Sequence, residues 1–306
     1  MKSWLWRFRC VHARAITVEP PAMSRVGGYF VLAMCLSLLL ATVVRRQSPS
    51  YAAPQQSAKA FHWPEGKRVA VSLSFDDGRA SQVDVGLDVI NPTGVKVTFF
   101  VNPGEEVFRS KLDGWKRAVA SGHEIGSHSV NHPCTGNFPW SLDNALENYT
   151  LEQMSQQLDD ANAQIEKSLG VRAVTFAYPC GQKFVGRGAE LKSYVPLIGR
   201  KFLVGRGYMD EYYNDPVFCD LAQAGGTAFD DMDYIEMVNH ISKAAEQGGW
   251  VIFAGHEIGH KAFQVTDEVA LVALCKYMQD PASGVWVDTV KNIGEYVVKQ
   301  RGSLGK

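Results

Sequence analysis

The sequence of 306 residues has little net charge and no internal repeat. Lys and Arg number 31 against 32 Asp and Glu, and charged residues make up only 21% of the chain. Apolar residues make up 46%. This balance is typical of a globular protein that buries a core, and it does not indicate disorder.

Charge is absent altogether from residues 26–44, which lie between Arg25 and Arg45. A run of this length suits the core of a signal peptide or a short membrane anchor. Small residues at Ser50 and Ala52, the two positions that a signal peptidase reads, predict a cleavage site after Ala52. We therefore expect a secreted, periplasmic or membrane-anchored extracytoplasmic protein, with an N-terminal extension over 1–52, a Ser-, Ala-, Gln- and Pro-rich linker over 53–60 and a folded domain over 61–301.

Basic residues become a minority once the extension is set aside. Residues 1–52 hold seven of the 31 Lys and Arg and one of the 32 Asp and Glu, so the remainder carries a net charge of −7. A nucleic-acid partner is therefore not expected. Nothing in the sequence indicates an oligomeric state.

Short β-rich runs recur through the remaining chain, and helical patterns lie between them. One helix is predicted from Leu151 to Leu169, capped by Thr150 with Gln153, and another is capped by Asp233. Alternating strands and helices predict a parallel sheet, and seven strands suit an α/β fold of the (β/α) barrel type. The seven predicted strands are 69–75, 96–101, 124–127, 174–178, 201–205, 250–254 and 285–288.

Two motifs near the ends of these strands carry the chemistry. Asp76 and Asp77 follow the first strand, and His128 and His132 follow the third. Asp77 with the two imidazoles offers three metal ligands and leaves positions open, as catalytic zinc sites do. Asp76 is then free to accept a proton. Taken singly, Asp-Asp-Gly is commonly a turn and an H-x-x-x-H pair is commonly a surface feature, so the prediction depends on the combination.

With these motifs, Ser74-Phe75-Asp76-Asp77-Gly78 and Gly122 to His132, the chain resembles the polysaccharide deacetylase family. The resemblance spans about residues 61–300 and implies a distorted seven-stranded barrel. It implies Asp76 as the catalytic base, with Asp77, His128 and His132 holding a divalent metal, Zn²⁺ first and Co²⁺ or another ion as alternatives. His256, after the strand 250–254, resembles the family's general acid.

The third family motif, R-x-P-Y/F-G, is represented here by Ala177 to Gly181, without the arginine that orients the base. Arg206, at the end of the fifth strand, is a candidate replacement. The fourth motif, Asp followed by Trp, is not recognisable, and we expect the acidic cluster around Asp230 to cap a helix. We expect the loop of Tyr178, Pro179, Cys180 and Gly181 to contact the acetyl oxygen.

Four cysteines remain after the extension, an even number that allows three pairings in an oxidising compartment. We favour a disulfide between Cys134 and Cys180, because both follow a proline on loops expected to lie side by side. Cys275 lies in an apolar run that suits a buried, unpaired thiol.

The expected activity is metal-assisted removal of acetyl groups from a polysaccharide or oligosaccharide, with N-acetyl favoured over O-acetyl. Chitin-type glycans, peptidoglycan, an exopolysaccharide and acetylated xylan remain open, and Phe138 and Trp140 are candidates for stacking on sugar rings. The alternatives are a secreted carbohydrate-binding protein on a barrel that has lost catalysis, and an H-E-x-x-H zinc protease at residues 256–260, a motif that requires a helix.

Overall fold

The computed structural model describes residues 61–260 and 262–303. The predicted signal peptide or anchor, its cleavage site and the linker therefore lie outside the described residues. Among the described helices, none combines the length and the apolar content needed to cross a membrane.

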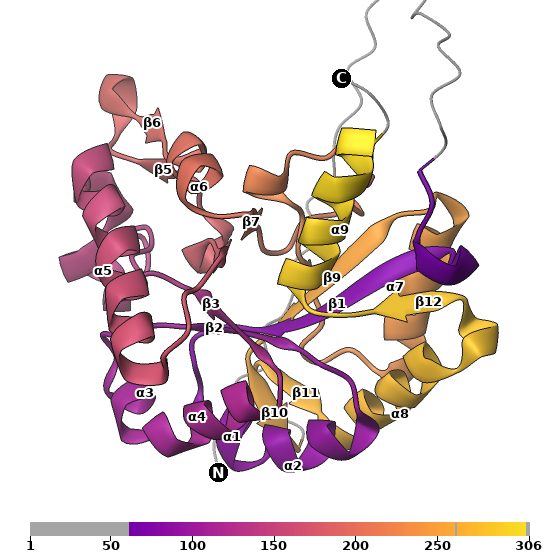
Figure 1. The fold of residues 1–306 in the computed structure, drawn as a ribbon. Coiled ribbons are helices and arrows are strands. Elements are labelled where there is room, and N and C mark those ends of the chain that lie inside the picture. Colours follow the sequence, from indigo (N-terminus) through magenta and orange to yellow (C-terminus); the bar gives the residue numbers. More distant parts are fainter. Residues whose placement is uncertain (1–60, 261, 304–306) are drawn as a thin grey trace, which may run out of the picture. The chain divides into compact units, whose positions relative to one another are not determined.

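A curled, wholly parallel sheet forms the centre of the domain (Figure 1). Seven of its strands follow one another in the order β7-β4-β3-β2-β1-β9-β8, and β12 pairs with the first half of β1, beside β2. Short pairs, β5 with β6 and β10 with β11, lie outside it. The strands of the main sheet are β1 (Val69–Phe75), β2 (Thr98–Val101), β3 (Glu124–Ser127), β4 (Thr175–Ala177), β7 (Val204–Arg206), β8 (Thr227–Ala228), β9 (Trp250–Gly255) and β12 (Val285–Val287).

Helices cover the outside of this sheet (Figure 1). They are α1 (Ala80–Asp84), α2 (Gly86–Ile90), α3 (Glu106–Ser110), α4 (Leu112–Ala120), α5 (Leu151–Leu169), α6 (Val195–Lys201), α7 (Tyr234–Glu246), α8 (Glu268–Gln279) and α9 (Val290–Ser303). The short pairs are β5 (Phe184–Val185) with β6 (Lys192–Ser193) and β10 (Glu257–Gly259) with β11 (Val265–Asp267).

The two predicted helix caps are both present. Thr150 and Gln153 form a capping box at the start of α5, and Gly170 ends that helix in the left-handed conformation. Asp233 and Glu236 form the equivalent box at the start of α7. These reciprocal bonds satisfy backbone N–H groups that have no partner inside the helix.

The fold class predicted from the sequence, a distorted (β/α) barrel, is confirmed. Each of the seven predicted strands corresponds to a strand of the main sheet, although the predicted 201–205 strand begins only at Val204 because α6 runs to Lys201. Strand β8 was missed, since its two residues are too few to show a periodicity. A parallel bridge from Arg206 to Ala224 joins the segment before β8 to β7, so the curled sheet closes on itself there.

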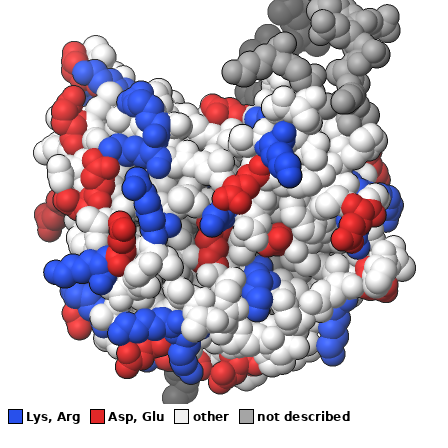
Figure 2. All heavy atoms as spheres, viewed as in Figure 1, with Lys and Arg blue, Asp and Glu red and all other residues white. Residues whose placement is uncertain are grey.

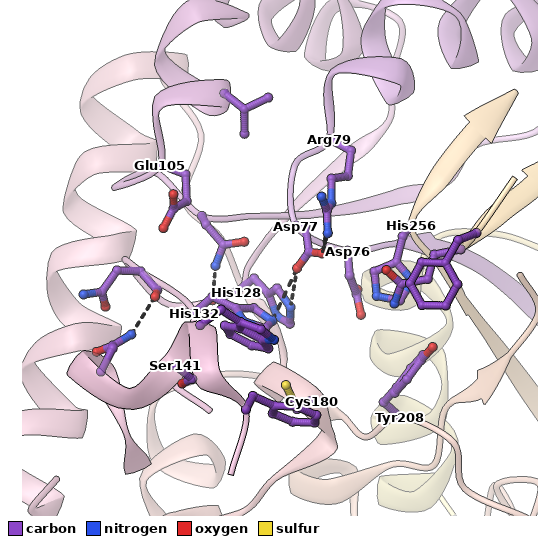
Figure 3. A pocket seen from close by; sticks show the side chains of 18 of the residues that line it. Asp76, Asp77, Arg79, Glu105, His128, His132, Ser141, Cys180, Tyr208 and His256 are labelled. Atoms are coloured by element: carbon purple, nitrogen blue, oxygen red, sulfur yellow. Dashed lines mark hydrogen bonds and ion pairs between the residues drawn. The ribbon is translucent and has the colours of Figure 1, made fainter. Parts of the chain in front are cut away.

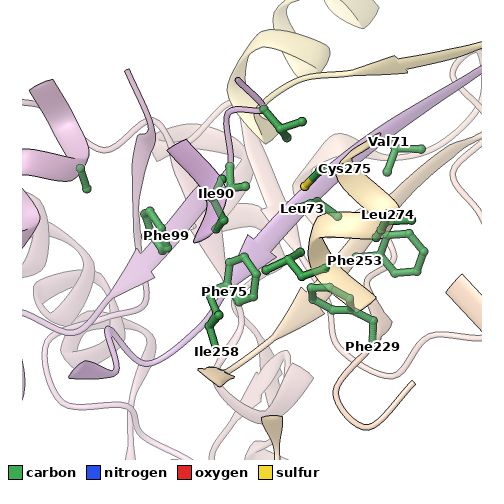
Figure 4. Close-up of a cluster of buried hydrophobic side chains, with 14 of the residues drawn as sticks. Val71, Leu73, Phe75, Ile90, Phe99, Phe229, Phe253, Ile258, Leu274 and Cys275 are labelled. Atoms are coloured by element: carbon green, nitrogen blue, oxygen red, sulfur yellow. The ribbon is translucent and has the colours of Figure 1, made fainter. Parts of the chain in front are cut away.

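The main core lies between the outer face of the sheet and its helices (Figure 4). Strand β1 is buried along its whole length, because it is covered on both faces. Val71, Leu73 and Phe75 point to the outer face and pack with residues of α2 and α8, among them Ile90 and Leu274. Cys275 is buried and unpaired in this core, as expected.

On the surface, both signs of charge are interspersed with uncharged residues over the face shown in Figure 2. That face carries no continuous basic stripe. This distribution is consistent with the low charge content of the sequence.

The protease alternative is wrong. Residues Glu257–Gly259 form strand β10, so His256 and His260 do not share a face of a helix. His256 lies at the end of β9 and is nearly buried, whereas His260 is exposed. The H-E-x-x-H spelling therefore has no zinc-protease geometry here.

We predict that Gly126→Ala in β3 destabilises the domain by about 1–3 kcal/mol, because overpacking a tight core forces its neighbours to shift. An added Cβ would lie 2.4 Å from ring atoms of Phe100 and 2.9 Å from the Thr175 hydroxyl. Gly259→Ala in β10 is the matched control, since no atom lies within 4 Å of its Cβ position. Urea unfolding of both variants measures the difference, and equal stabilities would contradict the prediction.

Candidate active site

A cavity of about 800 Å³ opens where the main strands end (Figure 3). The carboxyl ends of parallel strands meet at one rim, so residues far apart in the sequence come together there. Asp76 and Asp77 follow β1, His128 follows β3 and His256 follows β9. All four line the cavity, together with His132.

Three of these side chains have the geometry of a metal site. Asp77 Oδ1 lies 3.4 Å from His128 Nε2 and 3.3 Å from His132 Nε2. One donor atom of each residue lies within 4.8 Å of the other two. A tetrahedral zinc ion with bonds of about 2.0–2.1 Å keeps its ligands about 3.3 Å apart, so the two measured separations fit this coordination.

The ring of His128 is oriented by a hydrogen bond to the nitrogen that does not face Asp77. Its Nδ1 lies 2.8 Å from the carbonyl oxygen of Ala177, which can only accept, so Nδ1 carries the proton. Nε2 then keeps its lone pair facing Asp77. A bond from the second ring nitrogen is how metal-binding histidines are usually oriented.

Protonation states in this cluster also suit a metal. Burial, together with the neighbouring His128, lowers the pKa of His132 to about 4, so this imidazole is neutral at neutral pH. Burial opposes ionisation of Asp77, but the two neighbouring imidazoles, His128 and His132, outweigh it and hold the pKa of Asp77 well below its usual range. Arg79 donates to the other oxygen, Oδ2, at 2.8 and 3.1 Å, which leaves Oδ1 facing the histidines.

Asp76 is paired with the arginine that we predicted as a replacement. Arg206 Nη2 donates to Asp76 Oδ1, and both side chains are buried. The guanidinium also donates to Gly207 O at 2.6 Å and lies over the Phe100 ring, 5.1 Å from its centroid. Arg206 of β7 is the cross-strand partner of Ala177 in β4. The arginine absent from the third motif is thus supplied from the position directly opposite it.

His256 is held by an aspartate that sequence reasoning misassigned. Asp230 Oδ2 accepts from His256 Nδ1 at 2.5 Å, and Asp230 Oδ1 accepts from the backbone N–H of His256 at 3.0 Å. Burial disfavours the imidazolium, but the bond to Asp230 and the charges of Asp76 and Asp77 outweigh it, and the pKa of His256 is raised. His256 Nε2 is left for the cavity.

The expectation that Asp230 belongs to a helix-capping cluster is therefore wrong. Asp233 alone forms the cap of α7, and Asp230 lies just after β8. The signal was weak in the sequence, because no tryptophan follows this aspartate and β8 is only two residues long.

The loop after β4 presents a single free donor. The N–H of Tyr178 donates to Arg206 O, and that of Gly181 donates to Tyr178 O. Pro179 has no N–H, which leaves that of Cys180 without a partner among the described residues. Cys180 lines the cavity and has a positive φ of 53°. Of the four predicted loop residues, Cys180 is therefore the one placed to contact a bound oxygen.

A disulfide ties this loop to the metal-site loop. Cys134 and Cys180 are bonded with an S–S distance of 2.07 Å, the pairing favoured from the sequence. Cys134 Sγ also lies 3.6 Å from His132 Nδ1. The link therefore joins the neighbourhood of His132 to the Cys180 N–H.

Aromatic side chains form one wall of the cavity. Phe138 and Trp140 are stacked with centroids 5.3 Å apart, and Trp140 is 63% exposed. Trp140 also lies 5.8 Å from the ring of His132. Tyr208 lines the cavity as well, edge-on to His256 at 5.5 Å. These rings lie beside the candidate metal ligands, where a sugar ring could stack on them.

Comparison with known proteins agrees with this geometry. Residues 64–191 match the family model described as polysaccharide deacetylase. Over this segment the chain is similar to polysaccharide deacetylases. The matched segment includes Asp76, Asp77, His128, His132 and the Cys180 loop, and it ends before Arg206, Asp230 and His256.

Curated relatives are matched over short segments only. A peptidoglycan-N-acetylglucosamine deacetylase of Listeria monocytogenes is 37% identical over 99 residues, which is 32% of this chain and 20% of that protein. A gellan lyase of a Bacillus species is 33% identical over 130 residues, which is 42% of this chain and 5% of that protein. The chain thus spans a fifth or less of the length of these two relatives.

The fold itself is shared more widely. A Mycobacterium smegmatis protein assigned to the polysaccharide deacetylases superposes with a TM-score of 0.55, covering 79% of this chain and 94% of the other at 16% identity. At this identity the likeness shows the fold alone.

We predict that Arg206→Gln destabilises the domain by about 3–5 kcal/mol, because it leaves the buried Asp76 carboxylate without its partner. Adding Asp76→Asn should recover much of that loss, since the charge is then gone. Lys201→Gln, which breaks the exposed pair with Asp159, is the control and should change stability by less than about 1 kcal/mol. Additive losses in the double variant, measured by urea unfolding, would show that the two side chains do not interact.

We predict that Asp230→Asn lowers the pKa of His256, because the carboxylate that stabilises its charged form is lost. Titration of the His256 imidazole by NMR measures this shift. Asp231→Asn is the control, as Asp231 is exposed and adjacent in sequence. A pKa of His256 that stays the same in Asp230→Asn would remove Asp230 from the site.

Proposed function

We propose that this protein is a metal-dependent hydrolase that removes acetyl groups from a polysaccharide or oligosaccharide, N-acetyl groups in preference to O-acetyl. The observation that carries the proposal is the meeting, in one cavity, of three metal donors, a paired carboxylate and a histidine of raised pKa. The similarity of residues 64–191 to polysaccharide deacetylases supports the coarser part of the proposal, a hydrolase of acetylated carbohydrates.

Asp77, His128 and His132 would hold the metal, with Zn²⁺ the first candidate and Co²⁺ or another divalent ion the alternatives. Two neutral imidazoles and one carboxylate are a donor set that zinc accepts while keeping positions open. When bound, such an ion polarises a carbonyl oxygen and lowers the pKa of a bound water.

Asp76 accepts the proton of the attacking water in this proposal. Its carboxylate lines the same cavity as that of Asp77. The bond from Arg206 fixes one oxygen and leaves the other for the water. A positioned general base contributes about 10²–10⁴-fold to rate.

The acetyl oxygen becomes negatively charged as the water adds to the carbonyl carbon. The free N–H of Cys180 is the protein's donor to that oxygen, held in place by the positive φ and the disulfide. Removing one such donor costs comparable enzymes about 10²–10³-fold in kcat.

His256 protonates the leaving group. Its raised pKa keeps more of the imidazolium at neutral pH, and Asp230 holds the ring by Nδ1 so that Nε2 can deliver the proton. An amine leaves only when protonated, whereas an alcohol needs this less. The raised pKa therefore favours N-deacetylation.

Phe138 and Trp140 would bind a sugar ring of the substrate next to the metal. Their stacked faces are exposed and adjoin His132. Similarity to a peptidoglycan deacetylase supports testing an N-acetylglucosamine polymer first, with chitin-type oligosaccharides and acetylated xylan beside it. An extracytoplasmic location, by secretion or by the apolar segment 26–44, would place the enzyme where such polymers occur.

The binding-protein alternative depended on two losses, the motif arginine and the fourth motif. Arg206 pairs with the proposed base and Asp230 with the proposed acid. Arg206 thus takes the place of the motif arginine, and Asp230 takes the place of the aspartate of the fourth motif. These contacts favour a working enzyme over a binding protein.

The deciding experiment is acetate release by residues 53–306 from N-acetylated chitooligosaccharides, peptidoglycan fragments and acetylated xylan, with Zn²⁺ or Co²⁺ added. We expect metal-dependent release, and Asp76→Asn should lower kcat by about 10²–10⁴-fold. Asp113→Asn, on the exposed face of α4, is the control and should keep wild-type activity. Zinc binding without acetate release from any substrate would refute the proposal in favour of the binding protein.

A further inference from the structure

One buried glutamine bridges the two residues that would move protons. Gln82 lies on α1, and its side chain is fully buried. Its amide Nε2 donates to the carbonyl oxygen of Asp76 at 2.6 Å and to that of His256 at 2.8 Å. One NH₂ group thus supplies a hydrogen to the backbone of the candidate base and a hydrogen to the backbone of the candidate acid.

The bridge lies where the sheet stops. Strands β1 and β9 are paired in register up to Phe75 and Gly255. The last bond across this edge runs from the N–H of Asp76 to Gly255 O at 2.8 Å. Beyond this bond the two segments separate toward α1 and β10, so their next carbonyl oxygens, those of Asp76 and His256, have no partner in the sheet. The side chain of Gln82 donates to both of these oxygens in place of a sheet hydrogen bond.

The arrangement is not explained by the bonding needs of the glutamine itself. Its other amide atom, Oε1, is buried and has no partner among the described residues. An apolar side chain of similar length would avoid that unfavourable burial. The structural contribution of the buried amide is therefore the two hydrogen bonds that it donates to the ends of β1 and β9.

The two strand ends are not equally constrained without Gln82. Asp76 is also held by Arg206, and its neighbour Asp77 belongs to the metal donors. His256 is held by Asp230, which lies on a loop next to the two-residue strand β8. Gln82 is therefore the direct side-chain link between the His256 backbone and the end of β1.

We propose that Gln82 is a positioning residue that sets the separation between Asp76 and His256. This inference rests on the proposed function. Losing the bridge leaves Asp76 near its place, whereas His256, still bonded to Asp230, can shift together with the loop that carries Asp230. Proton delivery to the leaving group therefore suffers more than activation of water. Displacements of about 1 Å in such groups can lower rates by about 10²-fold.

The test compares substrates that differ in their need for the acid. Gln82→Met keeps the length of the side chain and removes both donors, and Gln82→Glu is the second variant in case the first does not fold. On an N-acetylated chitooligosaccharide we expect kcat to fall about 10–100-fold with KM nearly unchanged. On 4-nitrophenyl acetate, whose leaving group departs unprotonated, we expect a fall of less than about threefold.

Asn214→Leu is the matched control. Asn214 is a buried amide whose Nδ2 donates to Gly225 O at 3.0 Å and to Trp250 O at 3.2 Å, at the opposite end of β9. Its loss also leaves two buried backbone groups without a partner, Gly225 O without its donor and the N–H of Gly225 without its acceptor at 2.8 Å, so it should lower the melting temperature similarly. It should not change the ratio of the amide rate to the ester rate.

A measurement without substrate separates this inference from the proposed function. Hydrogen exchange of the peptides covering residues 74–82 and 250–258 should become faster in Gln82→Met, more so in the second peptide, while Zn²⁺ affinity stays at the wild-type value. Wild-type protein that releases no acetate would refute the proposed function, and the exchange result would still decide the bridge. Equal falls on both substrates, or unchanged exchange at 250–258, would overturn the role of Gln82.

Discussion

The parallel pairing of β1 is the constraint on which the rest of the structure depends. This strand is bonded to β9 along one edge and to β12 and then β2 along the other, and it is buried throughout. Because its neighbours run in the same direction, their carboxyl ends reach the same rim. Asp76, Asp77, His128 and His256 are therefore collected by topology before any of their side chains interact.

Collecting so many ionisable groups in one buried place creates an electrostatic problem, and dedicated partners solve it. A buried carboxylate without a partner is strongly unfavourable. Here Arg206 faces Asp76, Arg79 faces the outer oxygen of Asp77, and Asp230 faces His256. The same contacts that stabilise these charges also orient the side chains. Because Arg79 binds one oxygen of Asp77, the other oxygen faces the histidines, and because Asp230 binds Nδ1 of His256, Nε2 faces the cavity.

The sequence was sufficient for the fold class, for seven of the strands and for the grouping of Asp77, His128 and His132, since each rests on a local pattern. Seven strands, two capping boxes and the H-x-x-x-H spacing can all be recognised within short windows. Asp230 and Gln82 could not be found in this way. Their roles depend on contacts to His256 across 26 and 174 residues, and nothing in their own neighbourhoods marks them. Strand β8, whose position carries Asp230 to the rim, is itself too short for a pattern.

Arg206 could be predicted from the sequence only in part, as a candidate for the arginine that is absent from the third motif. The family motif places an arginine at the end of β4, where this chain has Ala177. The register pairs Ala177 with Arg206 on the neighbouring strand, and adjacent parallel strands lie only about 4.8 Å apart. An arginine side chain is long enough to span the distance between two adjacent strands. An arginine on β7 therefore still reaches Asp76, and the small side chain of Ala177 leaves space for it. What the proposed base requires is a guanidinium beside its carboxylate, whichever strand carries that arginine. A motif written along one strand records the commonest position from which that carboxylate is reached, and the sheet register gives the alternative.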